Sequence, residues 1–386
     1  MEQHIPGIVL KDGLTQPVFD YKRCLFEKVY VETPVDTDGD GRLDLIAVYI
    51  RRPLETTQGM RVPAIYVANP YMLECNEDWY VPHDVDRDVS PYPQQHITES
   101  DITFDPSTVS FPQPRYPRAT VGYADTAPTE EIPLDCISDW YSYFNSRGYA
   151  SVFCGGLGTR GSQGFNCCGS PEETAAFKAV IDWLNGRCRA FTNLTDNIEI
   201  RADWCTGKVA MSGKSYLGTM CIAVASTGVE GLETIIPEAA ISNWYDYYRC
   251  NGLNLPAIGW QGAALDILAK YCFSRAKDPE DYASVREAYA AWLEGIAADE
   301  DRDSGNYSRW WDMRNYLKAA DRFKASVFLV HGLADWNVKP THCVNLFAAM
   351  ESRGIPCKMM LHQGGHIYIH DLQGSRFNEM LHLWLD

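Results

Sequence analysis

A strand-then-helix order repeats between residues 149 and 225, and it limits the fold more than any other feature of the chain. A strand-like run at 149–154 precedes a helical stretch at 172–184, and a second run at 208–211 precedes a small, apolar stretch at 218–225. Strands that alternate with helices pair in parallel, because each helix returns the chain across a face of the sheet. The pattern therefore predicts an α/β fold with a mostly parallel sheet and helices on both faces.

Two further strands, at 26–33 and 43–51, alternate polar and apolar residues and are expected to pair with each other. The loop at 36–41, Asp-Thr-Asp-Gly-Asp-Gly, resembles the first half of an EF-hand calcium loop. The twelfth position is Ala47, where a calcium site needs a bidentate glutamate, and no helices flank the loop. A tight Asp-Gly hairpin turn is the preferred interpretation.

A long irregular stretch follows the predicted strand at 62–68. Residues 73–133, which we call the excursion, are rich in proline, aspartate and aromatic residues and show little periodicity. A stretch of that length without regular structure is usually functional or wraps another element. We expect it to be an excursion from the core and not a separate domain.

Residues 243–323, which we call the cap segment, carry helical patterns and no convincing strand. Strand signals resume at 326–332 and 356–362. We therefore expect a core built from residues 1–242 and 324–386, interrupted by a helical cap insertion.

The charge of the chain excludes some partners. Its 51 acidic and 34 basic residues give a formal net charge of −17, which repels nucleic acid and anionic membrane surfaces. No apolar run approaches the roughly 18 to 20 residues of a membrane span. The thirteen cysteines include no C-x-x-C pair, and the start of the chain lacks the features of a signal peptide. These features favour reduced thiols and a cytoplasmic location.

The stretch VAMSGKSYLGTM at 209–220 fits two kinds of site. A phosphate-binding loop reads G-x-x-x-x-G-K-[ST], but Lys208 stands where that loop has its first glycine. A nucleophile elbow needs a strand, a sharp turn with small neighbours and a helix, and it would present Ser215 as a reactive hydroxyl. The second glycine, Gly218, comes one position later than in the common G-x-S-x-G pattern. An ordinary serine in a strand-to-helix turn is the alternative.

Two residues after later strands could activate that serine. Asp335 follows the strand at 326–332, and His366 follows the strand at 356–362. Ligands of open parallel sheets bind at the carboxyl ends of the strands. The chain order Ser215, Asp335, His366 is that of α/β-hydrolase triads, in which a base takes the serine proton and an acid orients the base. A helix N-cap for the aspartate and a surface loop for the histidine are the alternatives.

His362, His366 and His370 are spaced four apart, like metal ligands on a helix. The glycines at 364–365 interrupt any helix there, so a zinc site is disfavoured. We predict neither a metal nor a cofactor.

Four longer motifs resemble a known family. GKSYLGT at 213–219, HGLADWNV at 331–338, GTRGS at 158–162 and VIDWLNGR at 180–187 are similar to the Xaa-Pro dipeptidyl-peptidases. That serine-peptidase group also contains cocaine-esterase-like acyl hydrolases. The resemblance runs from about residue 20 to the end, includes the displaced second glycine, and implies an α/β-hydrolase fold with a helical cap.

The resemblance also implies roles for individual residues. Ser215 would be the nucleophile, Asp335 the orienting acid and His366 the general base and then acid. The backbone N–H of Tyr216 and the hydroxyl of Tyr71 would form the oxyanion hole. The pocket for proline would be formed by Trp244, Tyr247, Asn337 and Val338. Ordinary packing of the aromatic residues is the alternative for Tyr71 and for the Trp-Tyr pair.

The chain departs from the family in two places. Relatives carry an acidic pair before a Leu-Asp-x-Leu stretch, and its glutamate binds the substrate amine; here Ala263 and Ala264 stand there. Asp266 and Asp246 are candidates to replace it, because a buried ammonium needs a carboxylate partner. Relatives also continue into a jelly-roll β-domain, whereas this sequence stops at Asp386, and the sequence leaves open whether it is a fragment.

The leading hypothesis is a serine hydrolase that cleaves Xaa-Pro dipeptides from the N-termini of peptides with proline at the second position. One alternative is an acyl esterase or amidase of the cocaine-esterase type. Another is a binding module with weakened catalysis on the same fold. The sequence does not fix the oligomeric state, and a homodimer stays open.

Overall fold

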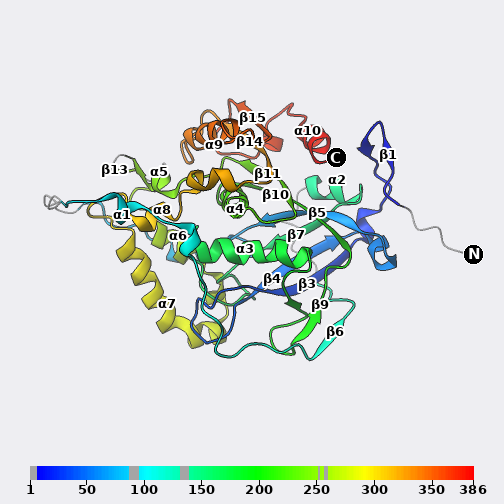
Figure 1. Ribbon diagram of the computed structural model, residues 1–386, viewed down its shortest axis with the longest axis horizontal. Helices are drawn as coiled ribbons and strands as arrows, with labels where there is room; N and C mark the ends of the chain where they lie inside the picture. The colour runs from blue at the N-terminus through cyan, green and yellow to red at the C-terminus, as the bar shows by residue number, and fades with distance from the viewer. Residues whose placement is uncertain (1–6, 87–94, 131–138, 251–252, 256–259) are drawn as a thin grey trace, which may run out of the picture.

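An eleven-stranded sheet runs through the centre of the computed structural model, which describes residues 7–86, 95–130, 139–250, 253–255 and 260–386 (Figure 1). In spatial order its strands are β15 (Cys357–His362), β14 (Ser326–Gly332), β11 (Leu232–Glu238), β10 (Cys205–Lys214), β5 (Val62–Ala68), β7 (Ala150–Cys154), β4 (Leu45–Arg52), β3 (Leu25–Glu32), β8 (Ala190–Phe191), β9 (Ile198–Ile200) and β6 (Gly122–Ala124).

The strands from β15 to β7 all pair in parallel, whereas β7, β4, β3, β8 and β9 pair antiparallel in turn. The expectation of a mostly parallel sheet is confirmed, and the sheet is of the α/β-hydrolase type. Because β5, β10, β14 and β15 run in the same direction, their carboxyl ends open on one edge of the sheet.

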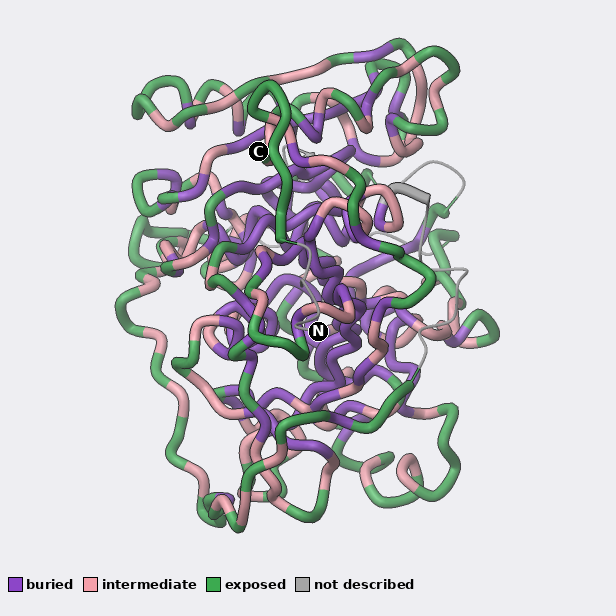
Figure 2. Tube along the Cα trace, turned by 90° about the vertical axis from the view of Figure 1, so that its right-hand side faces the viewer, coloured by how far each residue is buried: buried purple, intermediate pink, exposed green. Residues whose placement is uncertain are grey.

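Hydrophobic residues cover both faces of this sheet, as parallel sheets require. Along β5, Ala64 and Tyr66 join one core cluster, while Ile65 and Val67 join a second. Helices α3 (Pro171–Leu184), α4 (Tyr216–Ala225) and α9 (Thr341–Glu351) pack on the first cluster, and α2 (Asp139–Asn145) and α10 (Phe377–Leu385) pack on the second. Figure 2 shows these buried residues in the middle of the molecule.

No described residue of the cap segment joins the large sheet. Its helices are α5 (Trp244–Tyr248), α6 (Leu265–Cys272), η6 (Ser274–Lys277), α7 (Pro279–Asp299), α8 (Arg309–Asp312) and η7 (Tyr316–Arg322). The expectation of no strand is wrong in one detail, since β12 (Arg249–Cys250) pairs with β13 (Leu253–Asn254). Two-residue strands are too short to show alternation in the sequence. In Figure 1 α7 lies on the opposite side from both chain ends.

The loop between β3 and β4 is longer than expected. The ladder ends at the pair Glu32 and Leu45, so the connection spans residues 33–44 and is not a tight turn. The Asp36 carboxylate accepts hydrogen bonds from the backbone of Gly39 and Gly41, at 2.9 Å each. These hydrogen bonds let the chain turn inside a longer loop. The Asp-Gly pattern of a two-residue hairpin turn does not reveal such side-chain hydrogen bonds.

The described part of the excursion wraps the cap segment, as expected. Asn76 N–H donates to the carbonyl of Tyr271 at 2.8 Å, and Phe104 N–H donates to Asp312 at 2.8 Å. Its regular elements are short: η3 (Glu77–Trp79), α1 (Glu99–Ile102), η4 (Pro106–Thr108) and strand β6. The remaining elements are β1 (Leu10–Lys11), β2 (Leu14–Thr15), η1 (Tyr21–Arg23), η2 (Leu54–Gln58) and η8 (Ile369–Asp371).

Among the described residues, no helix combines the length and the hydropathy that a bilayer crossing would need. Eleven of the cysteines in the described part of the chain are free thiols.

Candidate active site

Ser215 occupies a strained turn between β10 and α4. Its backbone angles are φ 61° and ψ −125°, in a region that residues other than glycine rarely adopt. A Cβ atom at Gly213 would lie 2.5 Å from the Cβ of Leu217, and one at Gly218 would lie 2.6 Å from the carbonyl of Gly213. Both glycines are therefore needed for the close approach of the strand end to the helix, which explains the spacing of the motif.

The start of α4 offers backbone donors beside this serine. Ser215 N–H donates to the carbonyl of Glu238 at 2.8 Å, and Thr219 N–H donates to the carbonyl of Ser215 at 2.8 Å. Tyr216 is the first residue of α4, where a backbone N–H has no acceptor inside the helix. Together with the helix dipole, this N–H can stabilise negative charge next to the serine.

Asp335 and His366 meet at the ends of two neighbouring parallel strands. Asp335 follows β14 and His366 follows β15, and their side chains are joined by a contact of 2.7 Å between Nδ1 and Oδ2. The other carboxylate oxygen of Asp335 accepts hydrogen bonds from the backbone of Asn337 and Val338, at 2.9 Å each. Asp335 is only 4% exposed, so its carboxylate is held in a fixed geometry by these three hydrogen bonds.

The carboxyl of Asp335 stays ionised despite its burial. Burial alone would raise its pKa, but hydrogen bonds from His331 and His366 outweigh this effect and hold the pKa well below its usual range. A permanently charged carboxylate favours the tautomer in which His366 carries its proton on Nδ1. The other nitrogen, Nε2, is then free to accept a proton.

A cavity of about 640 Å³ opens at this edge of the sheet. The predicted site residues that line it are Tyr71, Ser215, Tyr216, Trp244, Tyr247, Asn337 and His366. The structure thus gives a direct contact for the Asp335–His366 pair and a shared cavity wall for Ser215 and His366.

The predicted pocket residues hold one another in place. Tyr247 donates from its hydroxyl to Asn337 at 2.8 Å, and Trp244 donates from Nε1 to the hydroxyl of Tyr316 at 3.1 Å. The rings of Tyr71 and Tyr216 meet edge to face, with centroids 5.7 Å apart. These contacts fix the aromatic walls of the cavity.

Val338 lies behind the cavity wall and not on it. Its side chain is fully buried and does not belong to the lining. Its N–H binds Asp335, and its carbonyl accepts a hydrogen bond from His331 Nε2 at 2.8 Å. The expected contact between Val338 and substrate is therefore replaced by backbone support of the acid.

Glu173 is buried and holds Tyr216, one of the residues that line the cavity. The hydroxyl of Tyr216 donates to both of its carboxylate oxygens, at 2.7 and 2.9 Å. Burial raises the pKa of Glu173 to about 7, although hydrogen bonds from Gly169 and Tyr216 oppose the shift. No sequence signal identified this residue, because it stands inside an ordinary helix.

Neither candidate for binding an amine lines the cavity. Asp266 contacts His83 at 2.9 Å, and Asp246 accepts a hydrogen bond from Asn243 at 2.8 Å. Ala263 does line the cavity. The sequence analysis also did not select further polar and aromatic residues of the lining; they are Asn69, Glu77, Tyr80, Lys214, Trp260, Tyr271 and Tyr368.

Two groups of described residues bring three possible metal ligands within 4.8 Å of one another. His83, Asp266 and Glu300 form one, and the aspartates 36, 38 and 40 form the other. Neither group includes a residue of the cavity.

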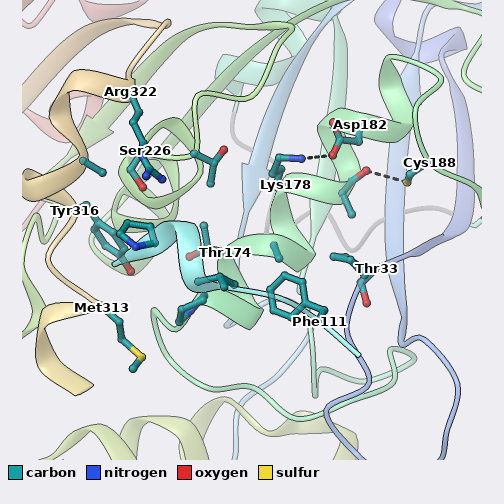
Figure 3. Close-up of a pocket in the computed structure, with 18 of the residues that line it drawn as sticks. Thr33, Phe111, Thr174, Lys178, Asp182, Cys188, Ser226, Met313, Tyr316 and Arg322 are labelled. Carbon is teal, nitrogen blue, oxygen red and sulfur yellow. Dashed lines mark hydrogen bonds and ion pairs between the residues drawn. The ribbon is translucent and has the colours of Figure 1, made fainter. Parts of the chain in front are cut away.

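A second cavity, of about 780 Å³, lies between α3, the excursion and η7 (Figure 3). Phe111, Thr174 and Tyr316 are among its walls, and a Lys178–Asp182 ion pair of 2.5 Å lies on one side. It contains none of the residues that the sequence analysis selected.

The chain is similar to known proteins of one peptidase family. The family model of the X-Pro dipeptidyl-peptidases (S15 family) matches residues 38–368. The Xaa-Pro dipeptidyl-peptidase of Pediococcus pentosaceus is 44% identical over 376 residues, covering 97% of this chain and 46% of that protein. That of Lacticaseibacillus casei is 43% identical over 384 residues, covering all of this chain and 48% of that protein. The chain spans about half the length of these curated relatives.

Among solved structures, the acylaminoacyl peptidase of Pyrococcus horikoshii aligns with a TM-score of 0.47 at 12% identity, over 95% of this chain and 42% of that one. An α-amino acid ester hydrolase aligns with a TM-score of 0.45 at 17% identity, over 95% and 51%.

Proposed function

The chain belongs to the X-Pro dipeptidyl-peptidase (S15) family, and we propose that it is a serine hydrolase that releases Xaa-Pro dipeptides from the N-termini of peptides. The observation that carries the proposal is the 2.7 Å contact between Asp335 and His366 beside the cavity that Ser215 lines. An activated serine needs a base and an orienting acid in this arrangement.

The reaction proceeds in two steps. Nε2 of His366 takes the proton of the Ser215 hydroxyl. The serine oxygen attacks the carbonyl carbon of the substrate proline at the same time, and a tetrahedral intermediate forms. This intermediate collapses as the C–N bond breaks, and His366 gives the proton to the leaving amine. In the second step water gives a proton to His366 and attacks the acyl-serine ester. His366 returns the proton to the oxygen of Ser215, and the dipeptide is released. Asp335 stabilises the positive charge that His366 carries in each step.

The oxyanion of the intermediate binds to two donors, the backbone N–H of Tyr216 and the hydroxyl of Tyr71. Burial raises the pKa of the Tyr71 hydroxyl well above its ordinary value, so the proton needed for donation stays in place. Loss of one such donor typically costs about 3 kcal/mol of transition-state stabilisation.

The proline ring binds among Trp244, Tyr247 and Asn337. A flat ring gains contact area against rigid aromatic walls without immobilising a flexible side chain. In this proposal the catalytic core is residues 1–242 and 324–386, and residues 243–323 act as the cap that completes the pocket. A reducing compartment such as the cytoplasm suits the free thiols of the described cysteines, and a homodimer is compatible with the proposal.

An acyl esterase or amidase is the second candidate function. It is favoured by Ala263, which lines the cavity in place of the carboxylate that exopeptidase relatives use. Rates on Gly-Pro-p-nitroanilide and on its N-acetylated form separate the two. The dipeptidyl-peptidase is expected to prefer the free amine by tenfold or more, and equal rates would support the amidase.

A fluorophosphonate probe tests whether the protein is a hydrolase at all. We expect labelling of the wild type and none of Ser215→Ala. A wild type that resists the probe at concentrations that label other serine hydrolases would instead indicate a binding module.

A further inference from the structure

Four aromatic rings form a continuous wall of the active-site cavity. Tyr71, Tyr271, Tyr80 and Trp260 follow one another with centroid separations of 6.0, 5.4 and 5.8 Å, and all four line the cavity. The planes of successive rings are inclined by 62°, 77° and 67°, so the rings meet edge to face and do not stack. We call these four residues the aromatic box.

The box is built from two distant parts of the chain. Tyr71 and Tyr80 belong to the segment after β5, whereas Trp260 and Tyr271 belong to the cap segment. Asn76 joins the two parts, since its backbone N–H donates to Tyr271 at 2.8 Å and its side chain donates to the carbonyl of Phe273 at 2.5 Å. Asn76 is buried, so the two halves of the box are held together by hydrogen bonds away from water.

Glu77 brings a negative charge to the same wall. It directly follows Asn76, and it is the one acidic residue among those that the structure describes as lining this cavity. Its side chain is exposed, and no cation of the described part of the chain forms an ion pair with it. Lys214 also lines the cavity, and its ammonium lies over the ring of Tyr368, 4.9 Å from the ring centroid. A cation bound beside the four rings would therefore have Glu77 as the acidic residue of the described lining.

The chemistry of such a wall differs from that of a buried acidic pair. A carboxylate pair binds an ammonium group through its N–H donors, whereas aromatic faces attract the positive charge itself and tolerate methyl groups on nitrogen. Methyl groups occupy positions 263 and 264, where such a pair would otherwise stand.

We propose that the aromatic box and Glu77 bind the positively charged N-terminus of the substrate, and that they accept N-methylated and quaternary ammonium groups as well as a primary amine. This inference rests on the proposed dipeptidyl-peptidase function and specifies its amine site.

A set of matched substrates tests the proposal. Gly-Pro-p-nitroanilide carries a primary amine, and N,N,N-trimethylglycyl-Pro-p-nitroanilide carries a permanent charge without N–H donors. The 3,3-dimethylbutanoyl-Pro analogue has the same shape without the charge. We expect kcat/KM for the trimethylglycyl substrate to exceed that for the neutral analogue by about tenfold, and to lie within about tenfold of that for Gly-Pro. Equal rates on the charged and neutral analogues would overturn the proposal.

Variants locate the preference on the residues of the wall. Glu77→Gln and Trp260→Leu should each reduce the ratio between charged and neutral substrates by threefold or more, mainly through KM. Glu74→Gln is the matched control, since Glu74 lies in the same segment, pairs with Arg160 at 2.8 Å and does not line the cavity. An unchanged ratio in both test variants contradicts the assignment, as does an equal loss in the control.

Binding to the Ser215→Ala protein separates this inference from the proposed function. Quenching of tryptophan fluorescence by trimethylglycyl-Pro-amide and by its neutral analogue is measured without turnover. Tighter binding of the charged ligand supports the box even if the wild type hydrolyses no Xaa-Pro amide. Equal binding of both ligands refutes the box even if the wild type is an active dipeptidyl-peptidase.

Discussion

The sheet edge that carries Ser215, Asp335 and His366 and the aromatic box that faces it are built in opposite ways. The sheet edge is set by parallel strands with a fixed register, and Asp335 there is 4% exposed. The box combines residues of irregular segments with Tyr271 of α6, and Trp260 there is 47% exposed. The comparison teaches that strand pairing fixes the positions of these three side chains, whereas contacts between distant segments hold the aromatic box together.

The largest expected effect lies at the sheet edge. Ser215→Ala should lower kcat/KM on Gly-Pro-p-nitroanilide by about 10⁶-fold, because the nucleophile is removed while the fold is kept. Thermal unfolding should be close to that of the wild type. A residual rate within a hundredfold of the wild type would place the reaction elsewhere.

Asp335→Asn should reduce kcat by about 10⁴-fold with little change in KM. An amide in place of the carboxylate leaves the packing intact but no longer fixes the tautomer of His366. Asp203→Asn, at an exposed aspartate that does not line the active-site cavity, is the control and should keep its activity. An active Asp335→Asn protein would separate the aspartate from catalysis.

The contribution of the oxyanion donor is smaller. Tyr71→Phe should lower kcat by a factor of about 10² to 10³, equivalent to about 3 kcal/mol. Tyr80→Phe removes a hydroxyl from the box and should change kcat by less than threefold. Similar losses in the two variants would mean that Tyr71 acts through packing alone.

Gly218 of the serine turn gives a prediction for the free energy of unfolding. Gly218→Ala should destabilise the protein by about 2 to 3 kcal/mol, because its Cβ would lie 2.6 Å from a carbonyl oxygen and 2.9 Å from Ala240. Gly295→Ala is the matched control, since its Cβ meets no atom within 4 Å inside α7. That variant should gain up to about 1 kcal/mol. Urea unfolding of both proteins measures the difference.

The smallest expected effect concerns pH. Because burial raises the pKa of Glu173 to about 7, the folded state binds more protons than the unfolded state above about pH 4.5. Stability should therefore fall as pH rises from about 5 to 7.5. Glu173→Gln should reduce that fall by about 2 kcal/mol. Urea midpoints across this range check it, and an unchanged slope would contradict the assignment.

The sheet edge could be predicted from the sequence because its signals are local. Apolar runs located the strands, and Asp335 and His366 were found because each follows such a run. The length of the β3–β4 loop was not predicted. It depends on hydrogen bonds that the Asp36 carboxylate accepts from the backbone of Gly39 and Gly41.

The box could not be predicted in the same way. Tyr80 and Trp260 have no periodic neighbours, and only the fold brings them together. Val338 was expected in the pocket because the family resemblance implied it, but the turn that binds Asp335 directs it into the core.

Mass spectrometry of the protein after reaction with a Gly-Pro diphenyl phosphonate tests the central claim most directly, because this reagent bonds only to a serine that a neighbouring base activates. We predict one phosphonate adduct on the peptide that contains Ser215, formed by the wild type and lost in His366→Ala. An adduct on another residue, or equal labelling of Ser215 without His366, would contradict the account.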